Sequence, residues 1–271
     1  MNINKYLNDR KKIVDEALDS CLPAGNEYPK AVHSAMRYSV FSGGKRVRPI
    51  LVLASCEVCG GRLKEALTAA CAIEMAHTYS LIHDDLPAMD DDDYRRGKLT
   101  CHKKYGEATA ILAGDALLTF AMELFCGGKN PKANNETIKV VTRAIGTYGM
   151  IGGQVVDIEK RREADLPTLT YINAHKTGAL ISASCRVGAI AARASKRKLE
   201  VLERYGEYIG FTFQVIDDIL DKEGFALVLG VKTARMEAAR LIEKAKGELK
   251  IFDKRADVLR DLADFILNRR K

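Results

Sequence analysis

Residues 213–221 read FQVIDDILD, and this stretch decides the fold class. Its polar side chains follow i, i+3, i+4, i+7 spacing, so they line one stripe of an α-helix. They are Gln214, Asp217, Asp218 and Asp221. The residues between them are apolar, and three carboxylates on an apolar helix repel one another severely unless cations bind to them. The stretch therefore predicts a core helix that also carries a metal site.

The same helical period extends along the rest of the chain. Apolar residues recur every three or four positions over 63–75, 110–125, 199–220 and 234–251, and glycines or prolines separate these segments. Alternating strand patterns are hard to find, and no linker or low-complexity segment divides the sequence. We therefore expect an all-α protein with a single domain over residues 1–271.

The composition is that of an ordinary globular protein, with 47% hydrophobic and 29% charged residues. No apolar run approaches the roughly 20 residues of a membrane span, and the N-terminus lacks the apolar core of a secretory signal. Seven cysteines lie mostly in apolar stretches, which favours reduced, buried thiols. Cys56 and Cys59 form a CxxC pair without a second pair, so we interpret them as small side chains on a helix. We expect a cytoplasmic protein without a membrane span.

The net charge of +7 is compatible with nucleic acid or with a small polyanionic substrate. The basic residues are not interleaved with aromatic ones, and the chain has no tryptophan. We therefore expect no nucleic-acid partner and a small anionic substrate.

A further acidic run, DDLPAMDDDD, occupies residues 84–93 directly after the apolar run 76–82. We call it the first acidic cluster, and residues 213–221 the second. A solvated loop explains the last aspartates of the first cluster but not Asp84 and Asp85, which interrupt an apolar segment. Magnesium typically binds one or two carboxylates together with substrate phosphates. The two clusters therefore predict carboxylates that face each other across a cavity, with magnesium ions between them.

Basic residues that suit phosphate precede the first acidic cluster. The segment GGKRVRP, residues 43–49, holds Lys45, Arg46 and Arg48 after a flexible glycine pair. Arginine binds phosphate bidentately, and lysine adds a point charge. The sequence leaves open which of the three point inward, and a solvated basic turn is the alternative.

Three more candidates flank the acidic cluster itself. Arg95 and Arg96 follow it directly, and His77 precedes Asp84 by two helical turns and so faces the same way. An isolated histidine would be a core residue. Beside these neighbours, His77 is a candidate donor to phosphate.

Five motifs occur in the order found in the trans-isoprenyl diphosphate synthases: GGKRVRP, HTYSLIHDDLPAMDDDDYRRG, GGQVVDIE, HKTGAL and FQVIDDILD. Over nearly its whole length the chain resembles this family, and most of all the bacterial farnesyl diphosphate synthases. The resemblance implies an isoprenoid synthase fold, an all-α bundle around a deep central cavity with the acidic clusters at its mouth. It also implies a homodimer and three Mg²⁺ ions that bind an allylic diphosphate.

The resemblance assigns roles to individual residues. Four match the family's metal-site positions: Asp84, Asp90, Asp217 and Asp221. Four match the residues that bind isopentenyl diphosphate: Lys45, Arg48, His77 and Arg96. Four match the residues that line the allylic diphosphate site: Arg95, Lys176, Thr177 and Gln214. A helical wheel would instead pair Asp84 with Asp91, but Pro87 forbids a regular helix there, so the family position Asp90 is preferred.

The implied reaction joins isopentenyl diphosphate to dimethylallyl and then to geranyl diphosphate, giving farnesyl diphosphate. The allylic diphosphate ionises, and the oxygen dipoles of Thr177 and Gln214 help to stabilise the cation. The proton is lost to the diphosphate, so no histidine or cysteine base is needed.

Product length is expected to depend on Tyr79, five residues before Asp84 and about 7.5 Å deeper along the helix. In the family, an aromatic residue there together with the insertion Pro87–Ala88 resembles the farnesyl-forming type. Ordinary core packing of Tyr79 is the alternative.

The sequence departs from the family pattern after Gly224, where a glycine- and lysine-containing loop is missing. Lys232 and Thr233 do not replace it, because they fall in the next predicted helix. Either the numbering passes over a mobile lid or the loop is deleted. We favour the mobile lid, because functional loops are often mobile without ligand.

Two other functions are weighed. A class I terpene cyclase would share the first acidic cluster but would lack GGKRVRP and would carry an Asn/Ser/Glu-type second metal motif. A non-catalytic partner subunit, or a helical binding protein that has lost activity, would not need both acidic clusters intact, and only a true deletion after Gly224 would favour it. The prenyltransferase is favoured over both.

Overall fold

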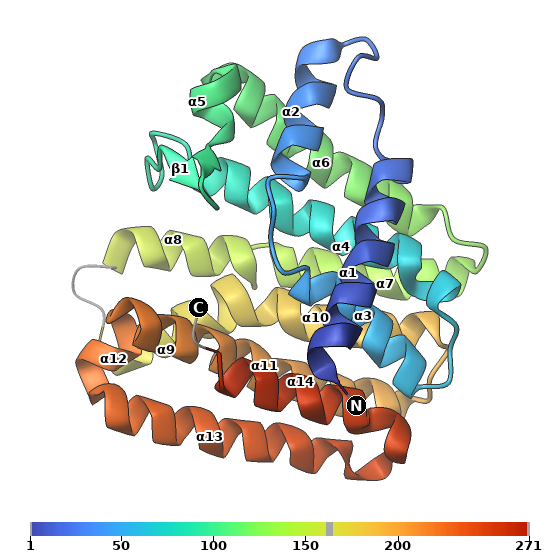
Figure 1. Ribbon diagram of the computed structural model, residues 1–271, viewed down its shortest axis with the longest axis vertical. Coiled ribbons are helices and arrows are strands. Elements are labelled where there is room, and N and C mark those ends of the chain that lie inside the picture. Colours follow the sequence, from blue (N-terminus) through green and yellow to red (C-terminus); the bar gives the residue numbers. More distant parts are fainter. Residues whose placement is uncertain (1, 161–164, 270–271) are drawn as a thin grey trace.

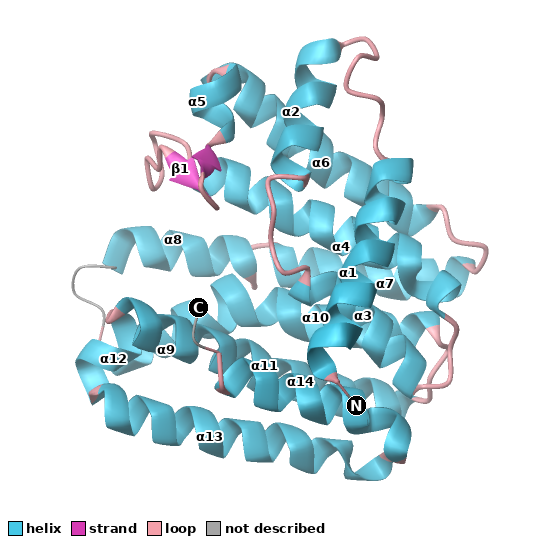
Figure 2. Cartoon of the chain, in the orientation of Figure 1, coloured by secondary structure: helices cyan, strands magenta, loops and turns pink. Residues whose placement is uncertain are grey.

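The computed structural model describes residues 2–160 and 165–269, and these are almost entirely helical (Figures 1 and 2). The expected all-α class is confirmed. The helices are α1 (Ile3–Cys21), α2 (Lys30–Val40), α3 (Val47–Val58), α4 (Leu63–Asp84), α5 (Cys101–Tyr105), α6 (Glu107–Cys126), α7 (Pro131–Ile145), α8 (Met150–Lys160), α9 (Leu166–Ile172), the π-helix η1 (Asn173–Gly178), α10 (Ala179–Ala191), α11 (Lys196–Asp221), α12 (Gly224–Leu229), α13 (Val231–Glu248), the 3₁₀ turns η2 (Leu249–Ile251) and η3 (Lys254–Ala256), and α14 (Asp257–Leu267). Two short antiparallel strands, β1 (Tyr94–Arg95) and β2 (Lys98–Leu99), form a small hairpin.

Helices α3, α4, α10 and α11 form the centre of the bundle, with α10 packed against both α3 and α11. Small residues allow this close packing. A Cβ at Gly188 of α10 would lie 2.1 Å from the carbonyl oxygen of Val52, and one at Gly210 of α11 would lie 2.7 Å from the Cα of Gly178. The small residues of segment 178–192 therefore place α10 in contact with both of its neighbours.

The loop after α4 folds back on the end of that helix. The helix stops at Asp84, three residues before Pro87, as the proline predicted. The amide of Asp90 donates to the carbonyl oxygen of Asp84 (2.9 Å), and the amide of Asp91 donates to that of Leu86 (3.1 Å). This loop brings Asp90 beside Asp84.

Helix α11 passes into α12 through a tight turn at Lys222 and Glu223. Lys222 adopts the left-handed conformation, and Gly224 has φ +45°. The amide of Phe225 donates to Oδ2 of Asp218 (2.9 Å), so this carboxylate caps the start of α12. The two helices meet directly here, with no lid between them, and the choice between a mobile lid and a deletion stays a prediction.

We expect Gly224→Ala to lower the free energy of unfolding by about 1–3 kcal/mol. A Cβ at this position would lie 2.2 Å from Oδ2 of Asp218, and the positive φ disfavours any L side chain. Chemical denaturation measures the change. Gly247→Ala is the matched control, because a Cβ there meets no atom within 4 Å and lies in α13. It should stabilise the protein by about 0.5–1 kcal/mol. Equal stability of the two variants would contradict the proposed strain at Gly224.

Helix α6 is the one helix among the described residues that is long and apolar enough to cross a membrane by length and composition. This is weak evidence for a span, since core helices meet the same criterion, and α6 packs against α4 and α2. All seven cysteines are free, and Cys126 is exposed. Cys56 is buried on α3 and Cys59 caps the same helix, which confirms the interpretation of this pair as helical residues.

Candidate active site

The segment GGKRVRP separates into one structural cation, Arg46, and two others, Lys45 and Arg48, with different surroundings. Arg46 is 3% exposed, and its guanidinium binds Asp15 (2.8 Å), Glu74 (2.7 Å) and the carbonyl oxygen of Val40 (2.6 Å). Arg46 therefore fixes the start of α3 in the core. Lys45 precedes Arg46 in the sequence and is exposed. Arg48 follows Arg46 by two positions and is half-buried.

Arg48, His77 and Arg96 gather into one basic group, as the sequence predicted. Nη1 of Arg48 lies 3.3 Å from Nε2 of His77. Burial and the charges of Arg48 and Arg96 lower the pKa of His77 well below its ordinary value, so the ring is neutral at neutral pH. Because arginine can only donate, Nε2 accepts and Nδ1 carries the proton. The group combines two guanidinium ions with a neutral imidazole, which suits an anion.

Arg96 reaches this group from the β-hairpin. It has φ +54°, and its Nη1 donates to the carbonyl oxygen of Gly43. A Cβ at Gly44 would lie 2.5 Å from the same Nη1. The glycine pair therefore leaves room for the Arg96 side chain to approach closely, and it also forms a flexible turn.

The first acidic cluster starts with two aspartates in different settings. Burial raises the pKa of Asp84 to about 6, and repulsion from Asp90 adds to the rise against the opposing charge of Lys176. Asp85 is 3% exposed and accepts from Nε of Arg95 (2.6 Å). Burial raises its pKa to about 6 as well, although the Arg95 charge opposes the rise. Asp84 therefore belongs to a crowded carboxylate group, whereas Asp85 holds Arg95 in place.

The π-helix η1 connects the two acidic clusters. Lys176 binds Oδ2 of Asp157 on α8 (2.6 Å), and its charge lowers the pKa of Asp84, against the larger effect of burial. The next residue, Thr177, donates its hydroxyl to Oε1 of Gln214 on α11 (3.2 Å). Single turns of π-helix are frequent at functional sites, where they reposition side chains. The predicted residues Lys176, Thr177 and Gln214 are thus brought together.

The aspartates of the second acidic cluster have different partners, although one helical stripe carries them. Asp217 forms an ion pair with Arg269, which follows α14. Asp218 is buried, where it caps α12 and accepts from Nε2 of Gln214 (3.1 Å). Asp221 at the end of α11 is exposed. A helical wheel does not reveal these differences.

Tyr79 is 5% exposed on α4, and its ring meets that of His83 edge-to-face with centroids 5.9 Å apart. Among the described residues its hydroxyl has no hydrogen-bond partner, and burial raises its pKa to about 12. The side chain is packed as a core residue near Asp84. Its role in product length stays a prediction.

Sequence reasoning missed four residues of this region: Asp85 as the partner of Arg95, Asp157 as that of Lys176, Asp218 as a helix cap, and Arg269. Asp157 lies in the motif GGQVVDIE, so its motif was a usable signal. The sequence held no such signal for Arg269, because its contact partner on α11 lies 52 positions away in the sequence.

The carboxylates suit hard divalent cations such as Mg²⁺, since Asp84, Asp85 and Asp90 repel one another and offer oxygen ligands. A separate group, Asp91, Asp93 and His102, has ligand atoms within 4.8 Å of one another, and both of its acids are exposed. Sequence analysis did not single out this group. Exposed acidic groups are common without a metal, so the crowded carboxylates near Asp84 fit the ion better.

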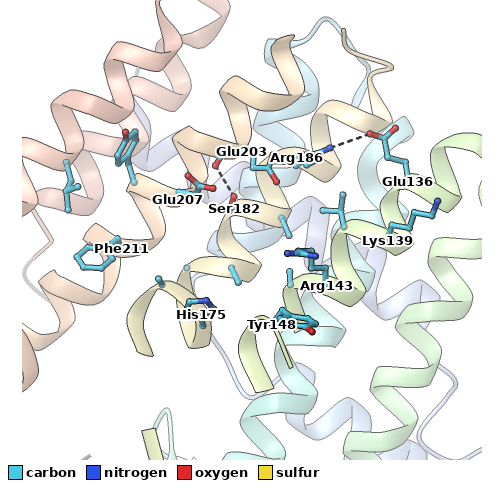
Figure 3. A pocket seen from close by; sticks show the side chains of 18 of the residues that line it. Glu136, Lys139, Arg143, Tyr148, His175, Ser182, Arg186, Glu203, Glu207 and Phe211 are labelled. Atoms are coloured by element: carbon cyan, nitrogen blue, oxygen red, sulfur yellow. Dashed lines mark hydrogen bonds and ion pairs between the residues drawn. The ribbon is translucent and has the colours of Figure 1, made fainter. Parts of the chain in front are cut away.

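A cavity of about 880 Å³ opens between α7, η1, α10, α11 and α13 (Figure 3). Arg186 in its wall contacts Glu136 and Glu203. Among the residues that the structure describes, none of the predicted site residues lines this cavity. It lies beside η1, where His175 lines it next to Lys176 of the predicted site.

Comparison with known proteins identifies the family. Residues 29–235 match the polyprenyl synthetase family. The chain belongs to the polyprenyl synthetase family. It is 45% identical to a dimethylallyltranstransferase of Fischerella ambigua, over 99% of this chain and 84% of the relative. It is 43% identical to a geranylgeranyl diphosphate synthase of Cyanophora paradoxa, over 99% of this chain and 97% of the relative.

Solved polyprenyl synthetase structures have the same fold. The crystal structure of an FPP/GFPP synthase from Zymomonas mobilis superposes with a TM-score of 0.93 at 38% identity, over 98% of this chain and 99% of that chain. The isoprenoid synthase fold is confirmed, and the chain is a prenyltransferase of isoprenoid biosynthesis. The alignment with the Fischerella ambigua protein spans 292 positions, more than the 271 residues here, so that relative has internal residues without a counterpart in this polyprenyl synthetase.

Proposed function

We propose that this polyprenyl synthetase condenses isopentenyl diphosphate with dimethylallyl diphosphate and then with geranyl diphosphate, and that farnesyl diphosphate is the product. The observation that carries the proposal is the neighbourhood of two opposite charge groups. Arg48, His77 and Arg96 form a basic group, and Asp84 and Asp90 form an acidic one a short distance along α4 and its loop. A diphosphate fits the first directly and the second through cations.

Asp84, Asp90, Asp217 and Asp221 are the proposed metal-site residues, with three Mg²⁺ ions. When bound, the metal would stabilise the negative charge that develops on the departing diphosphate. Arg95, held by Asp85, would bind the same diphosphate, and Lys176 would add charge beside Asp84.

The basic group would act on the second substrate, and Thr177 and Gln214 on the cation. Lys45, Arg48, His77 and Arg96 would bind the diphosphate of isopentenyl diphosphate, so that its double bond is held next to the allylic carbon. The hydroxyl of Thr177 donates to Gln214, so both oxygens have fixed directions and can stabilise the cation. The allylic carbon–oxygen bond breaks, the new carbon–carbon bond forms, and the proton leaves to the diphosphate.

One assay tests this function against a terpene cyclase and a non-catalytic subunit. Radiolabelled isopentenyl diphosphate is supplied with dimethylallyl or geranyl diphosphate and Mg²⁺, and the products are separated by chain length. A fifteen-carbon product supports the proposal. Cyclic products without use of isopentenyl diphosphate would indicate a cyclase, and no product would favour the non-catalytic subunit.

We expect Tyr79→Ser to lengthen the product beyond fifteen carbons, because the buried ring then no longer blocks the growing chain. The names of the relatives include geranylgeranyl diphosphate synthases, so a twenty-carbon product of the unmodified protein is the second candidate. Chain-length analysis of the unmodified protein distinguishes the fifteen-carbon from the twenty-carbon product. Tyr105→Ser, a change of the same kind away from Asp84, is the control. A Tyr79→Ser variant that still stops at fifteen carbons would show that this ring is not the floor.

The remaining expectations are part of the same proposal: a single domain over 1–271, a cytoplasmic location and a homodimer. A row of half-exposed apolar side chains on one face of α8 supports the dimer. These are Ile151, Val155 and Ile158. Sedimentation equilibrium tests it, and a monomer at assay concentrations would contradict it.

A further inference from the structure

Arg269 carries its charge from the end of α14 to the C-terminal part of α11. Its Nη2 forms an ion pair with Oδ1 of Asp217, and its Cζ lies 4.3 Å from the ring centroid of Phe213, one turn earlier on α11. The side chain is 8% exposed. The guanidinium is therefore enclosed against the second acidic cluster.

This buried cation has few partners. Among residues 2–160 and 165–269, Nε and Nη1 of Arg269 are buried without a hydrogen-bond partner. A guanidinium offers five N–H donors, and a buried ion pair gives a clear net stabilisation only when the remaining donors are satisfied. The contact with Asp217 is thus less well satisfied than that of Arg46, which has three acceptors.

Asp217 and Asp221 are the two carboxylates of this cluster in the proposed metal site, and Asp217 is the one that Arg269 contacts. Asp218 is engaged instead by the amide of Phe225 and by Gln214. The guanidinium of Arg269 takes one acceptor direction of Oδ1 of Asp217, and its positive charge repels a divalent cation that approaches this carboxylate. A cation that binds Asp217 must therefore either bind against the charge of Arg269 or displace it.

We propose that Arg269 is the internal counter-ion of Asp217 and competes with the divalent cation for this carboxylate. The inference rests on the proposed function, since Asp217 is a metal ligand only if the protein is a metal-dependent synthase. In the metal-free protein the guanidinium neutralises this half-buried carboxylate. Metal binding at Asp217 is then opposed by the charge of Arg269, and removal of this charge favours the metal.

The proposal is tested by binding of Mn²⁺, whose free form is measured by electron paramagnetic resonance, in the presence of inorganic diphosphate. Arg269→Gln is expected to bind the Asp217-dependent ion about 5-fold more tightly than the wild type, because the charge that opposes the metal is removed. Arg235→Gln is the matched control, because it removes the same charge from an exposed position on α13. It should leave the affinity unchanged.

A double-variant cycle separates competition from a general loss of positive charge. In the Asp217→Asn background, Arg269→Gln should have no further effect on Mn²⁺ binding. An equal gain in both backgrounds would overturn the proposal, and so would an Arg269→Gln affinity equal to that of Arg235→Gln. If Arg269→Gln does not fold, as judged by circular dichroism, Arg269→Lys replaces it and should shift the affinity in the same direction by a smaller factor.

The same data distinguish failure of the inference from failure of the proposed function. If Asp217→Asn loses an ion and Arg269→Gln changes nothing, only the competition is wrong. If Asp84→Asn and Asp217→Asn both keep the full Mn²⁺ stoichiometry, the proposed metal site itself is wrong.

Discussion

Asp84→Asn is expected to lower kcat/KM about 10³-fold, the size seen when one group that stabilises charge in the transition state is removed. Asparagine keeps the shape of the side chain but cannot neutralise a divalent cation. Burial raises the pKa of Asp84 to about 6, so ionisation of this carboxylate at neutral pH lowers the stability of the folded protein. The variant should therefore be at least as stable as the wild type. Steady-state kinetics and thermal unfolding on the same sample check both parts.

Variants of two neighbouring aspartates provide a parallel test and a control for Asp84→Asn. Asp90→Asn should lose activity by a similar factor, because Asp90 lies beside Asp84 and raises its pKa. Asp91→Asn removes the same charge from an exposed position with φ +53°, which asparagine tolerates, so it should retain activity. If Asp91→Asn is the inactive variant, the helical-wheel pairing is right and the family assignment of Asp90 is wrong.

Glu74→Gln is expected to lower the free energy of unfolding by about 3–5 kcal/mol. Its carboxylate binds Nη1 of Arg46 (2.7 Å), and the two side chains are only 3% and 2% exposed. Removing the charge of Glu74 leaves the Arg46 guanidinium buried with Asp15 as its remaining carboxylate. Urea denaturation followed by circular dichroism measures the change in midpoint.

Glu243→Gln provides the control for this pair. Glu243 binds Lys246 on the surface of α13 with 74% of its side chain exposed, and such pairs contribute little to stability. Its midpoint should stay at the wild-type value. A Glu74→Gln variant with an unchanged midpoint would mean that the pair with Arg46 does not hold the start of α3.

The sequence by itself determined the helical class and the positions of the acidic clusters. Helical period and breakers are local properties, so the end of α4 before Pro87 and the helix over 196–221 followed from residues close in the chain. The grouping of Arg48 with His77 was also predicted, through the motifs that contain them. The same pattern could not tell an omitted lid from a deletion, because both leave identical neighbours around Gly224.

Only the tertiary structure decided what each charged side chain of the motifs contacts. Arg46 and Arg48 lie two positions apart, yet one is a buried anchor and the other belongs to the basic group. Asp217 and Asp218 are adjacent, yet the first pairs with Arg269 and the second caps α12. The physical reason is that a buried charge must find a partner, and that partner is supplied by whichever distant helix packs there. The FQVIDDILD stripe therefore predicted a cluster of carboxylates, and the packing of α12 and of the residues after α14 gave Asp218 and Asp217 different partners.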